Sequence, residues 1–358
     1  MKENEKKLLF ELCRVNCEDK STLVNLINDG NITAEVLGHL LWNRMIGVAY
    51  ENLKELPYDI TINREFKTSI KDMTFHYIDR NNDYFECIKY LNSILKTYEK
   101  EFVMLKGAYL CQIYTPGGRI ANDVDLLVKE KSLDDIGNCL KNHGFIQGYI
   151  KNDCLVPATR EEIIYSRMMK GETVPYVKEV NLKTLKWLEV DINFSLDYKP
   201  GDSDVVNRIV DQGEYTKNVE VSIRVPHKFD FIIHLCQHLY KEATTLPWIN
   251  MKRDMTLYKF IDIGVMIDLL SLDELTLLCK RIIELDAQIS CYYAIYCYNQ
   301  LLGGNEKTNR IIELLDLDNT SFIHKVIAPS EHKMYIYKEK NIANRFWHAN
   351  RKELLIDI

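Results

Sequence analysis

The sequence predicts an α+β protein in which a small mixed β-sheet core is flanked by N-terminal and C-terminal helical regions. Apolar residues recur at three- and four-residue spacing up to residue 101, give way to short apolar runs and strict alternation, and return to helical spacing from residue 226. These changes predict a helical region, an α/β core, a helical domain and a tail packed on that domain, with boundaries at 1–101, 102–225, 226–303 and 304–358.

The first region is expected to be helical throughout. Asn31 and Thr33 precede an apolar stretch and are natural helix caps. The stretch from Arg64 to Glu101 is a long amphipathic pattern whose apolar side is formed by Phe75, Ile78, Phe85, Ile88, Leu91, Ile94 and Leu95. Aromatic residues at this spacing are typical of core packing.

The core region contains three segments typical of strands. Residues 102–107 form a short apolar run that ends in glycine, and residues 123–128 follow a helical segment and a Gly117–Gly118 turn. Residues 187–196 alternate between apolar and polar side chains, which indicates a half-buried strand. Before this third strand, a helix is expected to begin after Ser132 as its N-cap and to stop at Gly144.

Charge and hydropathy narrow the class of partner. The formal net charge is -6, whereas a protein that grips a long nucleic acid normally carries a basic surface. We therefore expect a small-molecule, peptide or protein partner rather than RNA or DNA. No window reaches the roughly 20 apolar residues of a membrane span, and the first residues lack the apolar region of a signal peptide. A cytoplasmic protein without membrane insertion is expected, and its oligomeric state is left open.

Two acidic residues, Asp123 and Asp125, alternate on a predicted strand and so share one face, with Cα atoms about 6–7 Å apart. Neighbouring carboxylates repel each other, and a divalent cation is the usual partner that relieves this repulsion. The pattern predicts a catalytic site for Mg²⁺, or Mn²⁺ in its place. Asp191 is the preferred third carboxylate, although Glu189 and Asn193 lie on the same polar face of its strand.

A glycine and two basic residues precede the acidic pair. Gly107 is expected to let the backbone turn tightly toward a triphosphate, with amides of the following helix as donors. Lys106 and Arg119 are candidate phosphate ligands, one as a point charge and the other through its planar fork. Surface ion pairing explains these two residues equally well. Each element is weak alone, but their order along the chain is a strong signal.

Several polar residues of the C-terminal helices remain ambiguous. His234 and His238 lie four residues apart, a spacing that suits zinc or a pocket, but the glutamate of a zinc-hydrolase motif is missing. Two partly buried helix histidines are the plainer interpretation. Lys241, Arg253 and Asp262 are equally consistent with substrate contact and with an ordinary charged helix face.

The segment that carries these candidates is LKGAYLCQIYTPGGRIANDVDLLV, residues 105–128. It resembles the DNA polymerase β-type nucleotidyltransferases, and most closely a bacterial family of uncharacterised nucleotidyltransferases, over about residues 8–270. The resemblance implies that Asp123 and Asp125 are metal ligands, that Asp191 is the third carboxylate and that Gly107 is the loop glycine. Ala108 departs from the Gly or Ser common in the wider superfamily, which would shift triphosphate binding toward Lys106 and Arg119.

The resemblance implies an enzyme that transfers an NMP from an NTP, such as ATP, to a small-molecule, peptide or protein acceptor and releases pyrophosphate. Two alternatives stay open: a non-catalytic nucleotide-binding or partner-binding protein on the same fold, and a toxin-like enzyme that modifies tRNA. The intact acidic residues argue against the first, and the negative net charge argues against the second. Neither the acceptor nor the NTP follows from the fold.

Overall fold

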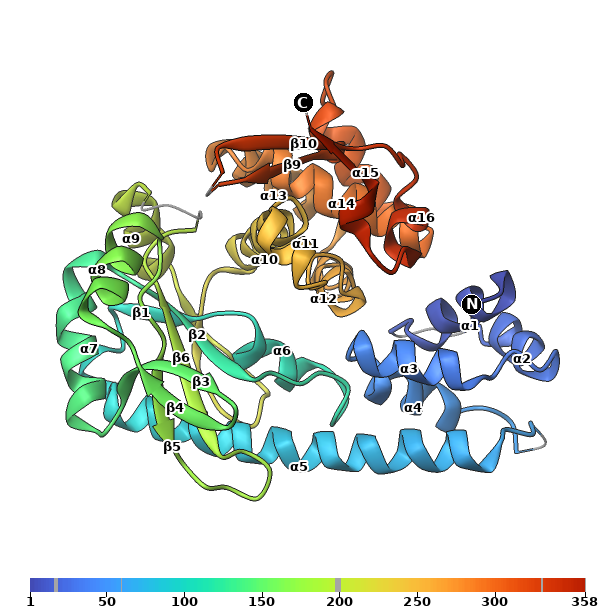
Figure 1. Ribbon diagram of the computed structural model, residues 1–358, viewed down its shortest axis with the longest axis horizontal. Coiled ribbons are helices and arrows are strands. Elements are labelled where there is room, and N and C mark those ends of the chain that lie inside the picture. Colours follow the sequence, from blue (N-terminus) through green and yellow to red (C-terminus); the bar gives the residue numbers. More distant parts are fainter. Residues whose placement is uncertain (16–18, 59, 197–200, 330, 358) are drawn as a thin grey trace. The chain divides into compact units, whose positions relative to one another are not determined.

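The computed structural model describes residues 1–15, 19–58, 60–196, 201–329 and 331–357 (Figure 1). The chain divides into two compact units, Met1–His227 and Lys228–Ile358. The fold is α+β, as predicted, with a six-stranded mixed sheet and helices before and after it. None of the helices among the described residues combines the length and the apolar character needed to cross a bilayer.

The first unit begins with helices, as the apolar spacing predicts. Thr33 caps its helix by accepting a hydrogen bond from the Val36 amide at 3.4 Å. Asn31 instead donates to the Leu26 carbonyl and closes the preceding helix. The elements are α1 (Glu3–Leu12), α2 (Ser21–Asn28), α3 (Ala34–Trp42), α4 (Ile46–Lys54), α5 (Arg64–Ile94) and the 3-10 turn η1 (Lys96–Tyr98).

Helix α5 runs from the N-terminal helices to the sheet (Figure 1). Its 31 residues make it about 46 Å long at 1.5 Å per residue. Asn63 caps its first turn by accepting from the Phe66 amide. Phe85, Ile88 and Leu91 are buried as predicted, but Phe75 is 49% exposed and packs beside the ring of Tyr50.

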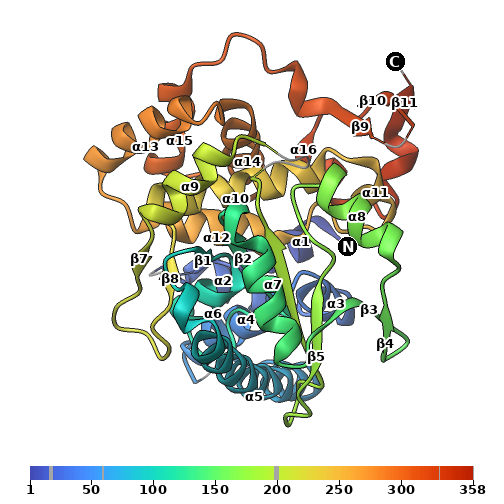
Figure 2. The same ribbon diagram turned by 90° about the vertical axis from the view of Figure 1, so that its left-hand side faces the viewer.

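The sheet has the strand order β1-β2-β6-β5-β3-β4 (Figure 1). Strands β3 and β4 form a hairpin at one end of this order (Figure 2). The pair β2–β6 is parallel, and every other pair in this sheet is antiparallel. The sequence pattern predicts β1, β2 and β6. The other three strands of this sheet, β3, β4 and β5, are seen only in the structure. The strands are β1 (Phe102–Met104), β2 (Asp123–Val128), β3 (Ile146–Lys151), β4 (Cys154–Pro157), β5 (Tyr176–Glu179) and β6 (Trp187–Asn193).

Helices and short strands complete the first unit around the sheet. The predicted helix after Ser132 is present and ends at Asn142, two residues before Gly144, which has a φ of +83°. Ser132 stands at the N-cap position, but its hydroxyl donates to the Glu101 carboxylate at 2.9 Å rather than capping the helix. The remaining elements are α6 (Gly107–Ile113), η2 (Glu130–Ser132), α7 (Leu133–Asn142), α8 (Arg160–Met169), α9 (Ser203–Asp211), β7 (Glu214–Tyr215) and β8 (Arg224–Val225).

Helix α9 covers part of one face of the sheet. Its apolar residues form a buried cluster with residues in and next to β1 and β2. The cluster consists of Val206, Ile209 and Val210 of α9 with Val103, Leu105 and Leu127. Side chains alternate along a strand, so Leu127 points to the same face as Asp125 and Asp123. The apolar end of this face is therefore covered by α9, and the acidic end of β2 lies beyond that cluster.

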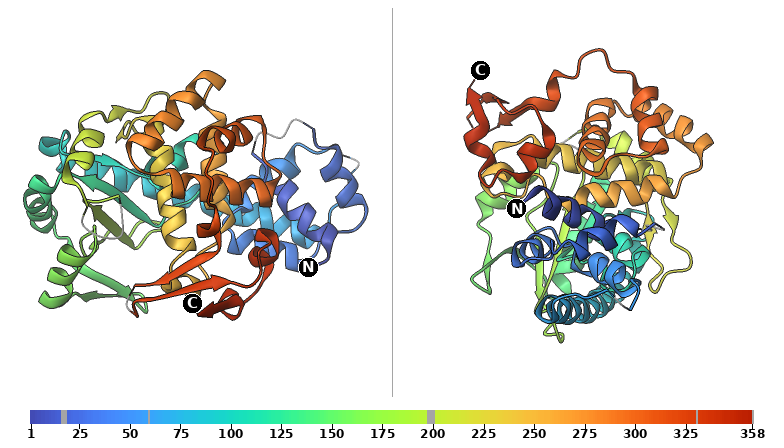
Figure 3. Two further views of the ribbon diagram at one scale, coloured as in Figure 1. Left: turned by 90° about the horizontal axis from the view of Figure 1, so that it is seen from above. Right: turned by 90° about the vertical axis from the view of Figure 1, so that its right-hand side faces the viewer.

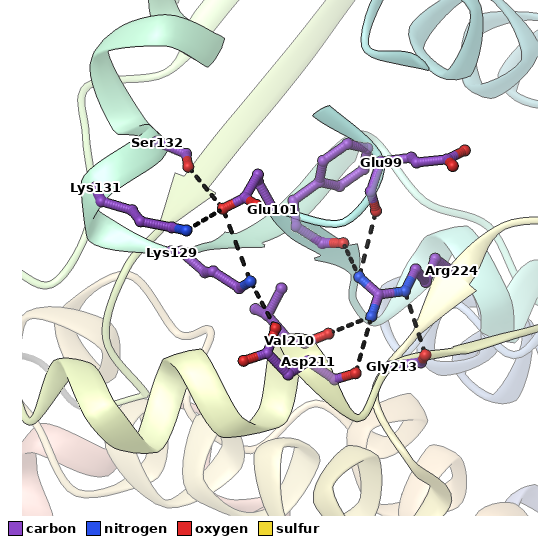
Figure 4. A network of polar contacts seen from close by, with 10 residues as sticks. Glu99, Glu101, Lys129, Lys131, Ser132, Val210, Asp211, Gly213 and Arg224 are labelled. Carbon is purple, nitrogen blue, oxygen red and sulfur yellow. Dashed lines mark hydrogen bonds and ion pairs between the residues drawn. The ribbon is translucent and has the colours of Figure 1, made fainter. Parts of the chain in front are cut away.

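A polar network fixes α9 to the sheet edge (Figure 4). Lys129, which is 6% exposed, donates to the Asp211 carboxylate at 2.6 Å and lies 3.8 Å from Glu101. The guanidinium of Arg224 donates to backbone carbonyls on both sides of the junction. Its acceptors are Val210, Asp211 and Gly213 at 2.5–3.2 Å, and Glu99 and Phe102 at 3.3–3.4 Å.

The second unit is mainly helical, and its C-terminal part adds a small sheet of order β11-β10-β9 that the weak patterning of the tail does not predict (Figure 3). Tail residues Val326, Ala328 and Tyr337 pack against Leu246 and Ile249. Its elements are α10 (Lys228–Ala243), α11 (Leu246–Asn250), α12 (Leu257–Asp268), α13 (Leu272–Glu284), α14 (Gln288–Leu302), α15 (Glu306–Leu315), η3 (Ser321–His324), β9 (Lys325–Ala328), β10 (Lys333–Tyr337), α16 (Ile342–Trp347), η4 (Arg351–Leu354) and β11 (Leu355–Asp357).

A buried ion pair holds the end of this tail. Arg351 forms two hydrogen bonds, of 2.5 and 2.7 Å, with the two carboxylate oxygens of Asp254. The Asp254 side chain is fully buried and that of Arg351 nearly so. A planar guanidinium on a carboxylate is the strongest geometry for such a pair, which fixes η4 to the loop before α12.

The network around Arg224 generates the first prediction. Replacing Arg224 with alanine removes the donor shared by carbonyls of α9 and β1, and should lower the free energy of unfolding by about 1–3 kcal/mol. Urea denaturation followed by circular dichroism measures the change. Arg64, exposed at the start of α5, provides the matched control, because its replacement with alanine should change stability by less than about 0.5 kcal/mol. Equal stability of the two variants would contradict this role of Arg224.

Candidate functional site

The parallel pairing of β2 with β6 brings the predicted acidic residues together. Asp125 is the register partner of Asp191, and Asp123 is the register partner of Glu189. Register partners on neighbouring strands point to the same face and lie about 4.8 Å apart. All four carboxylates therefore project from one face, where Asp191 lies beside the other two predicted acids rather than far from them.

Burial and mutual repulsion both raise the pKa values of Asp123, Glu189 and Asp191. Burial raises the pKa of Asp191 well above its usual range, and the charges of Asp123, Asp125 and Glu189 raise it further. The pKa of Asp123 is raised by burial and then by Asp125. Glu189 follows the same pattern, with burial as the main cause of its raised pKa. A cation bound at this acidic face would therefore lower the repulsion between its carboxylates.

Lys106 supplies part of that charge. Its ammonium donates to Oδ1 of Asp125 at 2.8 Å, and the Asp125 residue is 5% exposed. Lys106 has φ +43° and ψ −113°, close to the second position of a type II′ turn, and the Ala108 amide closes that turn onto the Leu105 carbonyl. A non-glycine residue with these backbone angles lowers stability by about 1–3 kcal/mol. The conformation persists only because contacts of the surrounding structure hold it in place.

The role predicted for Gly107 needs correction in one respect. The residue with positive φ at this turn is Lys106, so the tight turn does not require Gly107. What requires glycine is space, because a Cβ at Gly107 would lie 2.4 Å from the Cβ of Ala121 and 3.3 Å from the Tyr84 hydroxyl. The Ala108 amide, expected to be open to a ligand, donates to Leu105, and the Tyr109 amide donates to Lys106.

Arg119 is buried, with 6% of its surface exposed, so surface ion pairing is the wrong interpretation of this residue. Its guanidinium donates to the Ile120 carbonyl, and its own carbonyl accepts from the Asn81 amide at 3.0 Å. These contacts fix the loop that leads into β2. A part for Arg119 in phosphate binding stays a prediction.

Helix α5 braces the site through polar side chains that its amphipathic pattern does not single out. The Tyr84 hydroxyl donates to the Asp123 carbonyl at 2.8 Å. Arg80 donates to the Asn122 side chain at 3.1 Å and to the Thr184 carbonyl at 3.3 Å. Asp83 accepts from the amide and the hydroxyl of Thr184. The loop before β2 and the turn before β6 are thereby fixed to the same two turns of α5.

The ambiguous residues of the C-terminal helices belong to the second unit. His234 is buried on α10, and Nδ1 of His238 lies 3.5 Å from the carboxylate of Glu242. Glu242 is also ion-paired with Lys259, whose ammonium donates to the Arg253 carbonyl at 2.5 Å.

Two further candidates lie in the same unit. Asp262 is 2% exposed on α12, and the Lys241 carbonyl accepts from the Thr245 hydroxyl at 2.9 Å. These contacts are internal to the second unit, and substrate contact by any of the five candidate residues stays a prediction.

The donor set of the acidic face suits a hard divalent cation. Across the described ranges, no three His, Cys, Asp or Glu side chains are already gathered as a ready-made metal site, and the Lys106 ammonium occupies Asp125. The donors are carboxylate oxygens, which Mg²⁺ prefers. Oδ1 of Asp191 is buried and accepts no hydrogen bond from the described residues, which leaves this oxygen open to a cation.

The close approach at Gly107 predicts a rescue. Gly107→Ala places a methyl group against Ala121 and should lower stability by about 1–3 kcal/mol through overpacking. The second substitution Ala121→Gly removes the atom nearest to the new methyl group, so the double variant should recover most of the loss. Thermal denaturation of the wild type, both single variants and the double variant measures the coupling. Strictly additive effects would show that this contact does not explain the glycine.

The pKa shift of Asp191 predicts a stabilising substitution. Between the carboxyl pKa of the unfolded chain and the raised pKa in the fold, the folded protein keeps a proton that the unfolded chain has released, so raising the pH through this interval favours unfolding. Asp191→Asn removes that penalty. In EDTA, the variant should melt higher than wild type near about pH 8, and the difference should shrink as the pH falls toward the ordinary carboxyl range.

Glu179, exposed at the end of β5 in the same sheet, provides the matched control for this prediction. Glu179→Gln makes the same carboxylate-to-amide change and should leave the melting temperature close to that of wild type. A melting temperature of Asp191→Asn below wild type at the higher pH would show that its carboxylate stabilises the empty site.

Comparison with known proteins identifies the family to which the chain belongs. No curated protein and no solved structure matches the chain. Residues 34–303 match the sequence model of a family described as uncharacterised nucleotidyltransferase. This span covers most of the 358 residues and includes Lys106, Asp123, Asp125 and Asp191. The chain is therefore a member of the uncharacterised nucleotidyltransferase family.

Proposed function

We propose that this protein is a metal-dependent nucleotidyltransferase that moves an NMP from an NTP to an acceptor and releases pyrophosphate. The observation that carries the proposal is the register of β2 and β6, which sets Asp191 beside Asp125 and within the same acidic face as Asp123. Three carboxylates from two strands provide the oxygen ligands of a two-metal site. The family membership supports nucleotidyl transfer in general.

In this proposal, Asp123 and Asp125 hold Mg²⁺, or Mn²⁺, together with Asp191. Bound there, the divalent ions would polarise the reacting phosphoryl group and offset the charge of the departing pyrophosphate. Asp191 has a buried oxygen without a hydrogen-bond partner among the described residues. Held in its ionised form by the cations, this carboxylate would receive the acceptor's proton. Its side chain would also orient the acceptor oxygen toward the α-phosphate.

Lys106 would serve the substrate phosphates. Its ammonium lies on Asp125, at the edge where the Leu105–Ala108 turn meets the acidic face. A cation that replaces Lys106 at Asp125 leaves the lysine side chain available to a phosphate oxygen a few ångströms away. Gly107 supports this role, because its missing side chain lets the turn lie close against Ala121.

For the acceptor we propose a small molecule, a peptide or a protein. The net charge of -6 disfavours a long nucleic acid, because such a partner needs many phosphate contacts. Any NTP, ATP included, can be the donor in this proposal, because it assigns residues to the phosphates and none to the base.

The proposal is tested by pyrophosphate release from each of the four NTPs in the presence of Mg²⁺. Asp123→Asn, Asp125→Asn and Asp191→Asn should each reduce the rate by about 10²–10³-fold or more, because each removes charge that stabilises the transition state. EDTA should abolish release in the wild type. Glu179→Gln, which changes an exposed acid of the same sheet, should retain the wild-type rate.

Other outcomes would redirect the assignment. Tight NTP binding without release by wild type would make the chain a nucleotide-binding protein. Labelling of tRNA in preference to other acceptors would favour the toxin-like activity. Release that persists in all three aspartate variants would rule out this acidic face as the catalytic site.

A further inference from the structure

The small sheet of the C-terminal tail has one packed face and one exposed face. Val326 and Ala328 of β9 and Tyr337 of β10 belong to the buried apolar cluster that includes α11. Side chains alternate along a strand, so the residues between them point to the other face. On the solvated face of an antiparallel sheet, polar side chains are the rule.

Apolar residues occupy the exposed face of this sheet instead. Met334 of β10 is the register partner of Ile327 on β9. Ile336, two residues further along β10, is the register partner of Ile356 on β11. Register partners point to the same face, so the four side chains form one contiguous apolar patch. Ile336 is partly buried, and the other three are 40–45% exposed. Apolar residues gathered in this way mark an interaction site, whereas scattered ones do not.

Two lysines border the apolar patch at one end. Lys325 of β9 is the register partner of Ile336, so it points to the exposed face. Lys338, an exposed residue, directly follows β10 and stands two residues after Ile336. Neither lysine side chain forms an ion pair or a hydrogen bond within the part of the chain that the structure describes. This end of the patch therefore carries positive charge that no acid offsets by direct contact.

The acids of the tail have partners elsewhere. Residues 325–357 contain four of them, Glu331, Glu339, Glu353 and Asp357. Asp357 has a different lysine as its partner at 3.7 Å, and Glu331 accepts from a tyrosine hydroxyl at 3.3 Å. Glu339 and Glu353 accept hydrogen bonds from asparagine residues. The exposed face is thus locally basic, although the whole chain has a net charge of -6.

The width of the exposed face fits a single helix. Neighbouring strands lie about 4.8 Å apart, so β9, β10 and β11 together span about 10 Å. An α-helix with its side chains is about 10–12 Å across. An amphipathic helix could lay its apolar stripe on the patch, and acids along the border of that stripe would reach the two lysines.

We propose that this face docks an amphipathic helix of a partner protein, and that acidic residues border the apolar stripe of that helix. The face is called the tail face below, and it consists of Lys325, Ile327, Met334, Ile336, Lys338 and Ile356. Charge argues against two other occupants. A second copy of the chain would add a second pair of lysines to the interface, and the negative net charge of the chain opposes an anionic membrane. The inference does not depend on nucleotidyl transfer.

The first test is fluorescence anisotropy of labelled peptides titrated with the full chain. The peptides are amphipathic and about 18 residues long, which is enough to form a helix. Their apolar stripe consists of Leu, Ile or Phe, and its borders carry either glutamate or lysine. The wild type should bind the glutamate peptides about tenfold more tightly than the lysine peptides, because only the glutamates complement the tail face.

Variants of the tail face show whether binding occurs there. Met334→Glu places a charge in the apolar patch and should weaken binding of the glutamate peptides by about tenfold or more. Ile283→Glu makes the same change in net charge at an exposed apolar position of α13, and should bind like wild type. The double variant Lys325→Glu, Lys338→Glu should prefer the lysine peptides, a reversal that unfolding would not produce. Circular dichroism of each variant checks its fold.

Several outcomes would overturn the proposal. They are no binding of either peptide series by wild type, equal affinity for both series, and equal weakening by Met334→Glu and Ile283→Glu. Sedimentation velocity tests the second copy: a dimer of the wild type that Met334→Glu abolishes would assign the tail face to self-association. Co-sedimentation with phosphatidylserine vesicles that the same variant abolishes would assign it to a membrane surface. Either result contradicts docking of an acidic helix.

Discussion

The parallel pairing of β2 with β6 is the constraint on which the rest of the candidate site depends. It places four carboxylates on one face, an arrangement that electrostatic repulsion alone would disperse. The opposite face of the two strands holds them together, because Val124, Leu126, Val190 and Ile192 are all fully buried there. Hydrophobic burial on one side of the sheet thus maintains an unfavourable charge density on the other.

Three features surround this pair, and one of them, Lys106, offsets part of the charge. Helix α9 covers the apolar end of the acidic face, so the carboxylates occupy only the start of β2. Lys106 brings an ammonium to Asp125 from a strained turn. Tyr84 holds the Asp123 backbone from α5. Functional sites typically contain residues that lower stability, such as like charges or a strained turn. Contacts from several surrounding elements hold such residues in place.

The parts of the fold that follow from local periodicity are predictable from the sequence. Apolar residues recur at helical spacing in the helices before residue 101. In the strands that carry Asp123 and Asp191, they follow the pattern of a strand. The strands β3, β4 and β10 have several exposed side chains, so the alternation of apolar and polar residues along them is too weak to predict a strand. The amphipathic pattern also predicts that Phe75 is buried, whereas it is largely exposed and has the ring of Tyr50 on α4 beside it.

The candidate site divides in the same way. The shared face of Asp123 and Asp125 follows from alternation within one strand. The register that sets Asp191 opposite Asp125 is a contact between distant segments, which spacing alone does not determine. Only the structure shows that a neighbouring methyl group leaves no room for a side chain at Gly107, that Arg119 is buried, and that Arg80 of α5 contacts the loop before β2.

The contacts of α5 also restrict how the sequence of this family can vary in length. Arg80, Asn81 and Tyr84 reach the loop before β2 only because they stand at set angles around one continuous helix. Inserting one residue between Asn81 and Tyr84 would rotate one contact relative to the others by about 100° and shift it by about 1.5 Å. Homologues that keep this loop should therefore conserve the number of residues in that stretch of helix, even where the residues themselves differ.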